Sequence, residues 1–121
     1  MMDGINIFMP GQVWQYQTRA GEENSTLTVL CIDELEDDAI IHIRVDGIQI
    51  GNASSIGHLP ISAAALESSL TAFIMHLDKL PEFSEGYDQW KQAFDSGKAG
   101  YWKLPVSEAI NAIDVMIQGK S

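Results

Sequence analysis

The chain has 121 residues, of which 45% are hydrophobic, and its 17 acidic and 7 basic side chains give a formal net charge of -10. A surface this negative disfavours nucleic acid and anionic membranes, and it favours a basic protein partner. The length predicts a single domain over residues 1–121, with a core that needs no disulfide.

Signals for export and for membrane insertion are not found in the sequence. The first ten residues lack the basic segment and the continuous apolar run of a signal peptide. No stretch reaches the roughly 20 apolar residues of a membrane span. Cys31 is the only cysteine and has no internal disulfide partner. We therefore expect a soluble, cytoplasmic protein.

The first half of the chain has the pattern of antiparallel strands. Residues 13–19 alternate in polarity and predict a strand, and residues 20–24 predict a turn. Residues 25–32 are rich in β-branched side chains, which predicts a second strand that returns antiparallel to the first. An acidic connection, residues 33–38, follows.

A β-hairpin is predicted over residues 39–50. Asp46 and Gly47 suit a two-residue type I′ turn, because both central positions of that turn need positive φ. In this register the apolar side chains share one side of the hairpin, and His42, Arg44 and Gln49 lie on the other. The apolar set is Ile41, Ile43, Val45, Ile48 and Ile50.

From residue 51 onward a loop and three helices are predicted. After a small-residue loop over residues 51–60, Ser62 is suited to cap a helix that ends before Pro81. A second helix is expected from near Ser84 to Gly97, and a third from Pro105 to Gly119, with a short edge strand over residues 101–104 between them. The helical stripes place four residues in the core: Phe73, Leu77, Ile110 and Ile113.

This order of elements predicts an α+β fold. We expect an antiparallel β-meander of four to five strands followed by three helices packed on one face.

Catalytic and metal-binding patterns are weak. The acidic run between Asp33 and Asp38 lacks the ligand spacing of a calcium loop, so we expect little or no calcium binding. His42, His58 and His76 have no local ligand spacing and predict structural or surface roles. No nucleophile elbow, phosphate loop or dinucleotide fingerprint occurs. The sequence therefore predicts no catalytic residue, no cofactor and no metal site.

Several segments resemble a family of small bacterial proteins of unassigned function. They are residues 11–27, 57–60, 86–90 and 104–106, so the resemblance extends over most of the chain. It supplies no catalytic motif. In general character alone, small acidic α+β proteins of this kind also resemble immunity proteins, which bind and neutralise bacterial toxins; that likeness is analogy.

The functional hypothesis is a non-enzymatic, acidic binding protein that engages a protein partner, with toxin neutralisation as its most specific form. Two alternatives stay open: a small-ligand-binding protein or enzyme with a cleft near His58, and a homo-oligomeric structural subunit, such as a homodimer. The expected partner-binding residues lie at one hairpin end and in the acidic connection: Arg19, Glu22, Glu23, Glu34, Glu36, Asp37 and Asp38.

Overall fold

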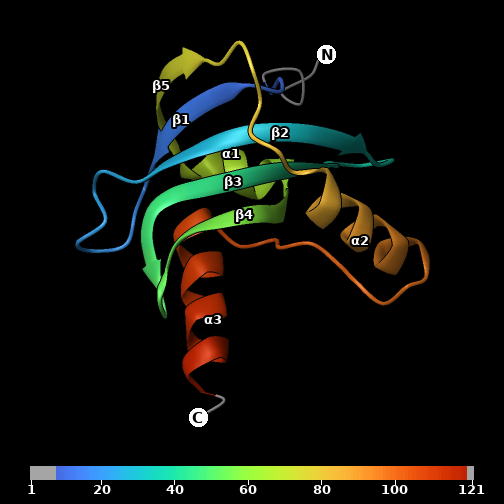
Figure 1. Cartoon of the computed structure of the whole chain (residues 1–121). Helices are drawn as coiled ribbons and strands as arrows, with labels where there is room; N and C mark the ends of the chain where they lie inside the picture. The colour runs from blue at the N-terminus through green and yellow to red at the C-terminus, as the bar shows by residue number, and fades with distance from the viewer. Residues whose placement is uncertain (1–7, 120–121) are drawn as a thin grey trace.

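The computed structural model describes residues 8–119 and contains a five-stranded antiparallel sheet in the order β4-β3-β2-β1-β5 (Figure 1). The first seven residues belong to the N-terminal segment in which no signal peptide was recognised, and they lie outside the described residues. The elements are β1 (Gln12–Tyr16), β2 (Thr26–Glu34), β3 (Ala39–Ile50), β4 (Ala53–Ser62), α1 (Ala63–Ser69), β5 (Leu70–His76), α2 (Ser84–Asp95) and α3 (Val106–Gln118). The predicted α+β class is confirmed.

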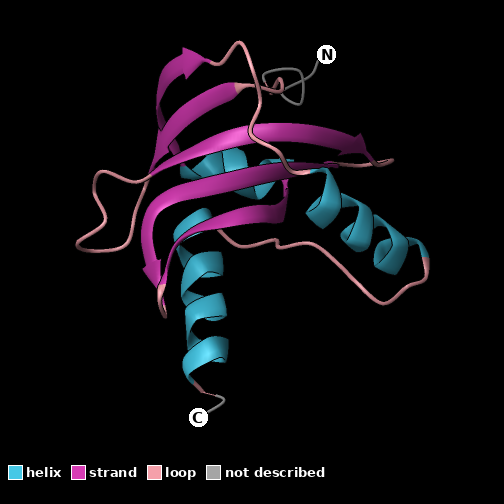
Figure 2. Cartoon of the chain, in the orientation of Figure 1, coloured by secondary structure: helices cyan, strands magenta, loops and turns pink. Residues whose placement is uncertain are grey.

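The helices lie around the sheet as Figure 2 shows. Leu66 of α1 and Ile110 of α3 belong to the same buried cluster as Ile43 of β3. Because successive side chains of a strand point to opposite faces, His42 lies on the other face. There its ring meets Tyr87 of α2 at a centroid distance of 4.9 Å. The sheet therefore has α1 and α3 on one side and contacts α2 on the other, so the α+β class is as predicted but the three helices do not share one face.

The hairpin predicted at Asp46 and Gly47 is wrong, because β3 runs unbroken over residues 39–50. Gly47 has a φ of +81°, as expected, but it lies in a bulge inside the strand. Between Asp46 and Ile50, β3 advances four residues while β4 advances two, from Ser55 to Ala53. The buried residues on the two sides of this bulge, Val45 and Ile48, are three positions apart in β3, which is the same spacing that a two-residue turn would give. The apolar set of the prediction is therefore buried as expected, although the chain does not reverse there.

The actual reversal lies at residues 51–52, so the loop predicted over residues 51–60 is also wrong. Residues 53–62 form β4, which pairs antiparallel with β3. The edge strand predicted at residues 101–104 is reduced to one parallel bridge between Trp102 and Ile61.

The first predicted helix begins as expected and ends early. The Ser62 hydroxyl accepts a 3.0 Å hydrogen bond from the Ala65 N–H and caps α1. The helix stops at Ser69, and β5 then pairs with β1 at the sheet edge. Consequently Phe73 is 51% exposed and Leu77 is only half-buried, so their prediction as core residues is wrong.

The last two helices match the prediction closely. α2 ends before Gly97, which has a φ of +77°, and α3 follows Pro105. Ile110 is fully buried, and Ile113 packs against the core while partly exposed.

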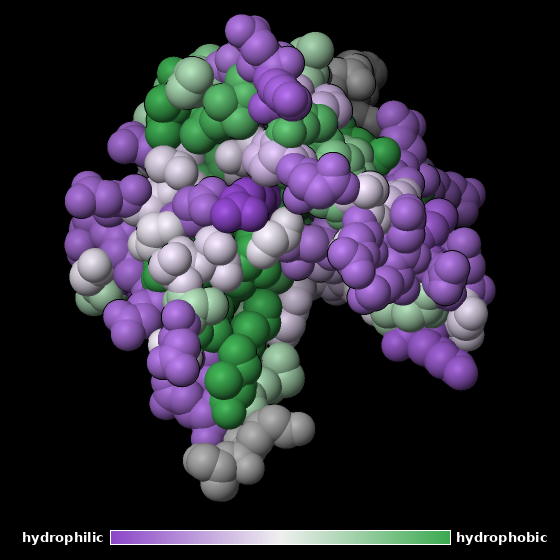
Figure 3. Space-filling view, in the orientation of Figure 1, coloured by the Kyte–Doolittle hydropathy of each residue, from purple (hydrophilic) through white to green (hydrophobic). Residues whose placement is uncertain are grey.

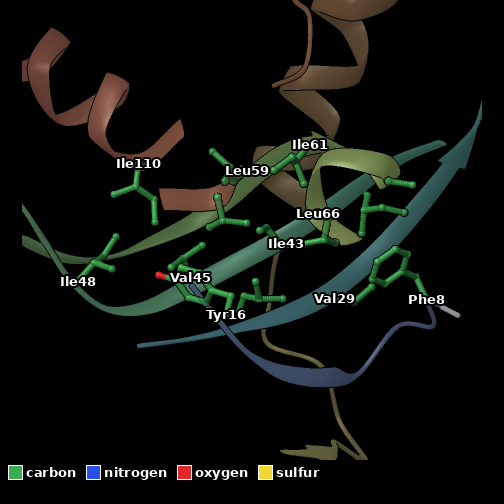
Figure 4. Packing of buried hydrophobic residues seen from close by; sticks show 14 of the residues in the cluster. Phe8, Tyr16, Val29, Ile43, Val45, Ile48, Leu59, Ile61, Leu66 and Ile110 are labelled. Atoms are coloured by element: carbon green, nitrogen blue, oxygen red, sulfur yellow. The ribbon is translucent and has the colours of Figure 1, made fainter. Parts of the chain in front are cut away.

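Figure 4 shows the main core between the sheet and α1 and α3. Ile43 and Val45 of β3 and Leu59 and Ile61 of β4 are at most 1% exposed. This burial fixes the register of β3 against β4, because a one-residue slip of either strand would send its two side chains to the opposite face. That register also positions the polar residues on the opposite face.

Candidate functional site

The predicted residues at the hairpin end form ion pairs and hydrogen bonds within the fold. Arg19 Nη2 lies 2.6 Å from Glu22 Oε2, and Arg19 Nη1 lies 3.1 Å from Asp114 Oδ2 of α3. Arg19 also donates to the Gln49 carbonyl, and the Gln49 N–H donates to Glu22. The hydrogen bond to Arg19 is the main cause that lowers the pKa of Glu22. These contacts tie the β1–β2 connection to the end of β3 and to α3, and only Glu23 of the predicted set here is exposed.

The second predicted group lies at the far end of β2. Glu34, Glu36 and Asp37 are exposed, whereas the Asp38 carboxylate accepts a 2.7 Å hydrogen bond from the Ala39 N–H. β2 has nine residues, so the two predicted groups are separated by about 30 Å along the strand. They do not share a surface.

α2 adds carboxylates to this second group. The Tyr87 hydroxyl donates to both oxygens of Asp33, at 3.1 and 3.0 Å, and so fixes the start of α2 beside the end of β2. Figure 3 shows hydrophilic side chains over α2, at the right of the view. We call the resulting surface the acidic end; its exposed carboxylates are Glu34, Glu36, Asp37, Glu82, Glu85 and Asp88.

A hydrogen-bonded chain of side chains lies beneath α2. Asp33 Oδ2 lies 2.9 Å from His42 Nε2, and His42 Nδ1 lies 2.8 Å from His58 Nε2. The His42 side chain is fully buried, and the two imidazole planes differ by only 11°. β2, β3 and β4 each contribute one member, so the sheet holds the three groups in line.

Burial controls the protonation of both imidazoles. It is the largest cause that lowers the pKa of His42, against the opposing effect of Asp33. Burial, followed by the neighbouring His42, lowers the pKa of His58 to about 4. Both rings are therefore neutral at neutral pH. Burial, followed by the hydrogen bond to Asp33, raises the pKa of Tyr87 to about 12, so its hydroxyl keeps the proton that it donates.

Aromatic side chains of α2 cover the histidines. The Trp90 ring lies 4.7 Å from that of His42, edge to face, and its indole N–H donates to the Gly100 carbonyl at 2.8 Å. Tyr87 covers His42 from the preceding turn of the helix. Tyr87 and Trp90 thus pack against an imidazole rather than against an aliphatic core.

His58 also borders a cleft of about 280 Å³. The other residues that line it come from its own strand and from the start of α2: Gly57, Glu82, Phe83, Glu85 and Gly86. The arrangement can accept hydrogen bonds and bind positive charge, because its titratable groups are two carboxylates and a neutral imidazole.

The sequence prediction missed this cluster because it read residues 51–60 as a loop. In the observed register His42 pairs with Pro60, which places His58 on the same face as a diagonal neighbour. Cys31 also pairs with His42, which places Asp33 diagonally on the other side. His76, on β5, is exposed and takes no part.

The remaining candidates offer little chemistry. Burial, followed by the charge of Asp33, raises the pKa of the Cys31 thiol to about 12, which leaves it protonated and weakly nucleophilic. Within residues 8–119 no three His, Cys, Asp or Glu side chains are arranged to hold a metal ion.

Comparisons with protein-family models, with curated proteins and with solved structures found no match to this chain. The resemblance to a bacterial family therefore stays a prediction. Over the residues that the structure describes, none of the helices has the length and apolar character to cross a membrane.

Proposed function

We propose that the protein is a non-enzymatic binding protein that captures a basic protein partner through the acidic end. The observation that supports this best is the junction of two acidic segments that are far apart in sequence. Tyr87 joins α2 to Asp33, and carboxylates of both segments are exposed around this contact. Neutralisation of a bacterial toxin in the cytoplasm is the most specific form of the proposal.

The charge of the acidic end suits long-range attraction. Arg19 is paired with carboxylates elsewhere in the fold, Arg44 lies beside the cleft and is paired with Asp46, and Lys91, the lysine on α2, lies 3.6 Å from Asp95. Exposed like charges in one region focus the field and raise the association rate of an oppositely charged protein. The proposal therefore predicts steering by charge more than tight contact at this surface.

The test is capture from the native host, followed by association kinetics on the captured protein. A triple variant, Glu36→Lys, Asp37→Lys and Asp88→Lys, changes exposed side chains only. Asp38 is left intact because its carboxylate accepts the Ala39 N–H at the start of β3. We expect the triple variant to fold normally and to associate about 10-fold more slowly at low salt, with most of the difference lost near 1 M salt.

The control reverses the charges of Glu67 on α1 and Glu108 on α3, both exposed and away from the acidic end, and the effects are compared per reversed charge, because the triple variant reverses three charges and the control two. It should lower the association rate much less. Equal rates for the wild type and the triple variant would contradict the proposal. So would capture of only a small metabolite or of a second copy of the chain, and these results would support the two alternatives.

A further inference from the structure

The hydrogen-bonded chain ends in a nitrogen that accepts hydrogen bonds. An ionised Asp33 carboxylate only accepts, so His42 Nε2 carries a proton and donates to it. His42 is neutral, which leaves Nδ1 with a lone pair, and His58 Nε2 must donate to that lone pair. His58 is neutral as well, so its Nδ1 is unprotonated. Among residues 8–119 no hydrogen bond to His58 Nδ1 is found.

The rest of the cleft has the same one-sided chemistry. Glu82 and Glu85 are exposed carboxylates, and Glu82 uses Oε2 for the Ser84 N–H and hydroxyl, while no hydrogen bond to its Oε1 is found within residues 8–119. Phe83 supplies an aromatic ring, and the glycines leave the space open. Among the residues that the structure describes, no lysine or arginine side chain lines the cleft.

One basic group lies nearby and is already paired. A Cβ placed on Gly57 would lie 3.9 Å from Arg44 Nη1. The Nε of Arg44 donates to both carboxylate oxygens of Asp46, each at 3.1 Å. This pairing offsets the repulsion that Arg44 would exert on a cation in the cleft.

We propose that this cleft receives an arginine side chain of the basic partner, an inference that rests on the proposed function. A planar guanidinium presents five N–H donors and stacks on aromatic rings, so it matches two carboxylates, an acceptor nitrogen and Phe83. The cleft, at about 280 Å³, lies just below the range of pockets for drug-sized ligands, which suits one long side chain. The cleft is thus the specific contact, and the acidic end supplies the steering.

Other ligands fit the lining less well. A phosphate or carboxylate ligand would be repelled by the carboxylates of the cleft, because both are negatively charged and both accept hydrogen bonds. A lysine ammonium carries the charge, but as a compact point charge it lacks the planar fork and stacks less well. A metal ion would need at least three suitable ligands, and no such group occurs in the described residues.

The experiment uses NMR titration of the full chain with Nα-acetyl-arginine amide. The matched probe is Nα-acetyl-citrulline amide, which keeps the shape of the side chain and removes its charge. We expect the arginine probe to shift the ring nitrogens of His58 and the amide of Gly86 in a saturable manner. The citrulline probe should bind at least about 5-fold more weakly.

Two variants locate the binding. Glu85→Gln removes one charge from the cleft without changing its size, and it should weaken the arginine probe about 3- to 5-fold. Glu67→Gln makes the same change on α1 and should leave the affinity unchanged. His58→Phe, checked for native circular dichroism, should abolish the response at Gly86.

Several results would overturn the inference: equal affinity for the two probes, equal weakening by Glu67→Gln and Glu85→Gln, or a proton on His58 Nδ1 in the free protein. Failure of the proposed function looks different. In that case the triple variant would still capture its partner at the normal rate, whether or not the arginine probe binds. Partner capture that depends on the acidic end but is unaffected by Glu85→Gln and by excess arginine probe would refute the arginine contact alone.

Discussion

At the scale of single residues, the most unusual feature is a pair of neutral histidines fixed by one carboxylate. Three strands hold Asp33, His42 and His58 within hydrogen-bonding distance, and the rings of Tyr87 and Trp90 shield His42 from water. Shielding favours the neutral imidazole because a charged ring would lose its hydration. Conditions that favour protonation of the rings should therefore lower the free energy of unfolding.

This preference for the neutral rings predicts how stability depends on pH. The pKa of His58 is near its ordinary value in the unfolded chain and about 4 in the fold, so the unfolded state binds more protons between these values. The contribution of His58 is complete above pH about 6.5 and is lost as pH falls toward about 4. Compared with His58→Gln, the wild type should therefore lose its advantage in the free energy of unfolding across this range.

Urea denaturation at several pH values measures this difference. His76→Gln, which changes an exposed histidine on β5, is the control and should follow the wild type. The charges of Asp33 and Lys91 also affect the pKa of His42, the hydrogen-bond partner of His58. Both residues are therefore kept in all variants. If the difference between wild type and His58→Gln did not change with pH, the proposed burial of His58 would be wrong.

At the scale of elements, β3 depends on Gly47. This residue combines a φ of +81° with a tight approach, because a Cβ added there would lie 3.1 Å from Ser25 Cα. Ser25 is itself fixed, since its hydroxyl donates to the Asp46 carbonyl and is 2.7 Å from the Tyr16 hydroxyl. Ser25 consequently has little freedom to move away from a Cβ at position 47.

We predict that Gly47→Ala lowers the free energy of unfolding by about 2–3 kcal/mol, since backbone strain and crowding add. Gly21→Ala is the matched control: its φ is +89°, and a Cβ there would meet nothing within 4 Å. It should cost only the backbone strain of about 1 kcal/mol. Equal losses in chemical denaturation would show that the contact with Ser25 is unimportant.

The short helix α1 leads to a second prediction at this scale. Phe73 lies on the edge strand β5, half-exposed, with its ring 5.3 Å from that of Trp14. Phe73→Ala should therefore cost about 1 kcal/mol, the value of an exposed aromatic pair. Leu66→Ala, in the fully buried part of α1, should cost about 2–5 kcal/mol. A larger loss for Phe73 than for Leu66 would contradict this placement.

These two elements show how far the sequence predicts the fold. The apolar residues of β3 and the cap at Ser62 were identified correctly, because alternation and capping are local signals. The bulge at Gly47 and the strand after Ser69 were not, since both depend on the pairing of distant segments. A shift of alternation by one residue fits a turn and a bulge equally well. The residues after Ser69 have helical spacing, but they form β5 because they pair with β1.

The same reason separates the two parts of the candidate site. The exposed carboxylates of residues 34–37 were predicted from composition alone. A cleft near His58 was named as an alternative, but its lining and its link to Asp33 were not predicted, because they require β4 beside β3 and α2 over both. Only the assembled sheet brings Asp33, His42 and His58 together.

At the scale of the whole molecule, the net charge of -10 is the dominant electrostatic fact. Ion pairs such as Arg19 with Glu22 stabilise the fold, while repulsion at the acidic end destabilises it. Salt weakens both, but the repulsion acts among many exposed groups, whereas the ion pairs of the described residues involve only a few acidic side chains. Repulsion should therefore decide the sign of the salt effect.

We predict that the melting temperature rises by a few degrees between about 10 and 150 mM salt, as the Debye length falls from about 30 Å to about 8 Å. The double variant Glu36→Lys, Asp37→Lys should show a clearly smaller rise, because it places positive charges among the remaining carboxylates of the acidic end. Glu67→Lys with Glu108→Lys makes the same change in net charge on other helices and should reduce the rise less. Scanning calorimetry at fixed pH provides the comparison. A melting temperature that falls with salt would mean that the ion pairs of Arg19 and Arg44 outweigh the repulsion. A basic partner would then gain no stability for the fold by neutralising the carboxylates of the acidic end.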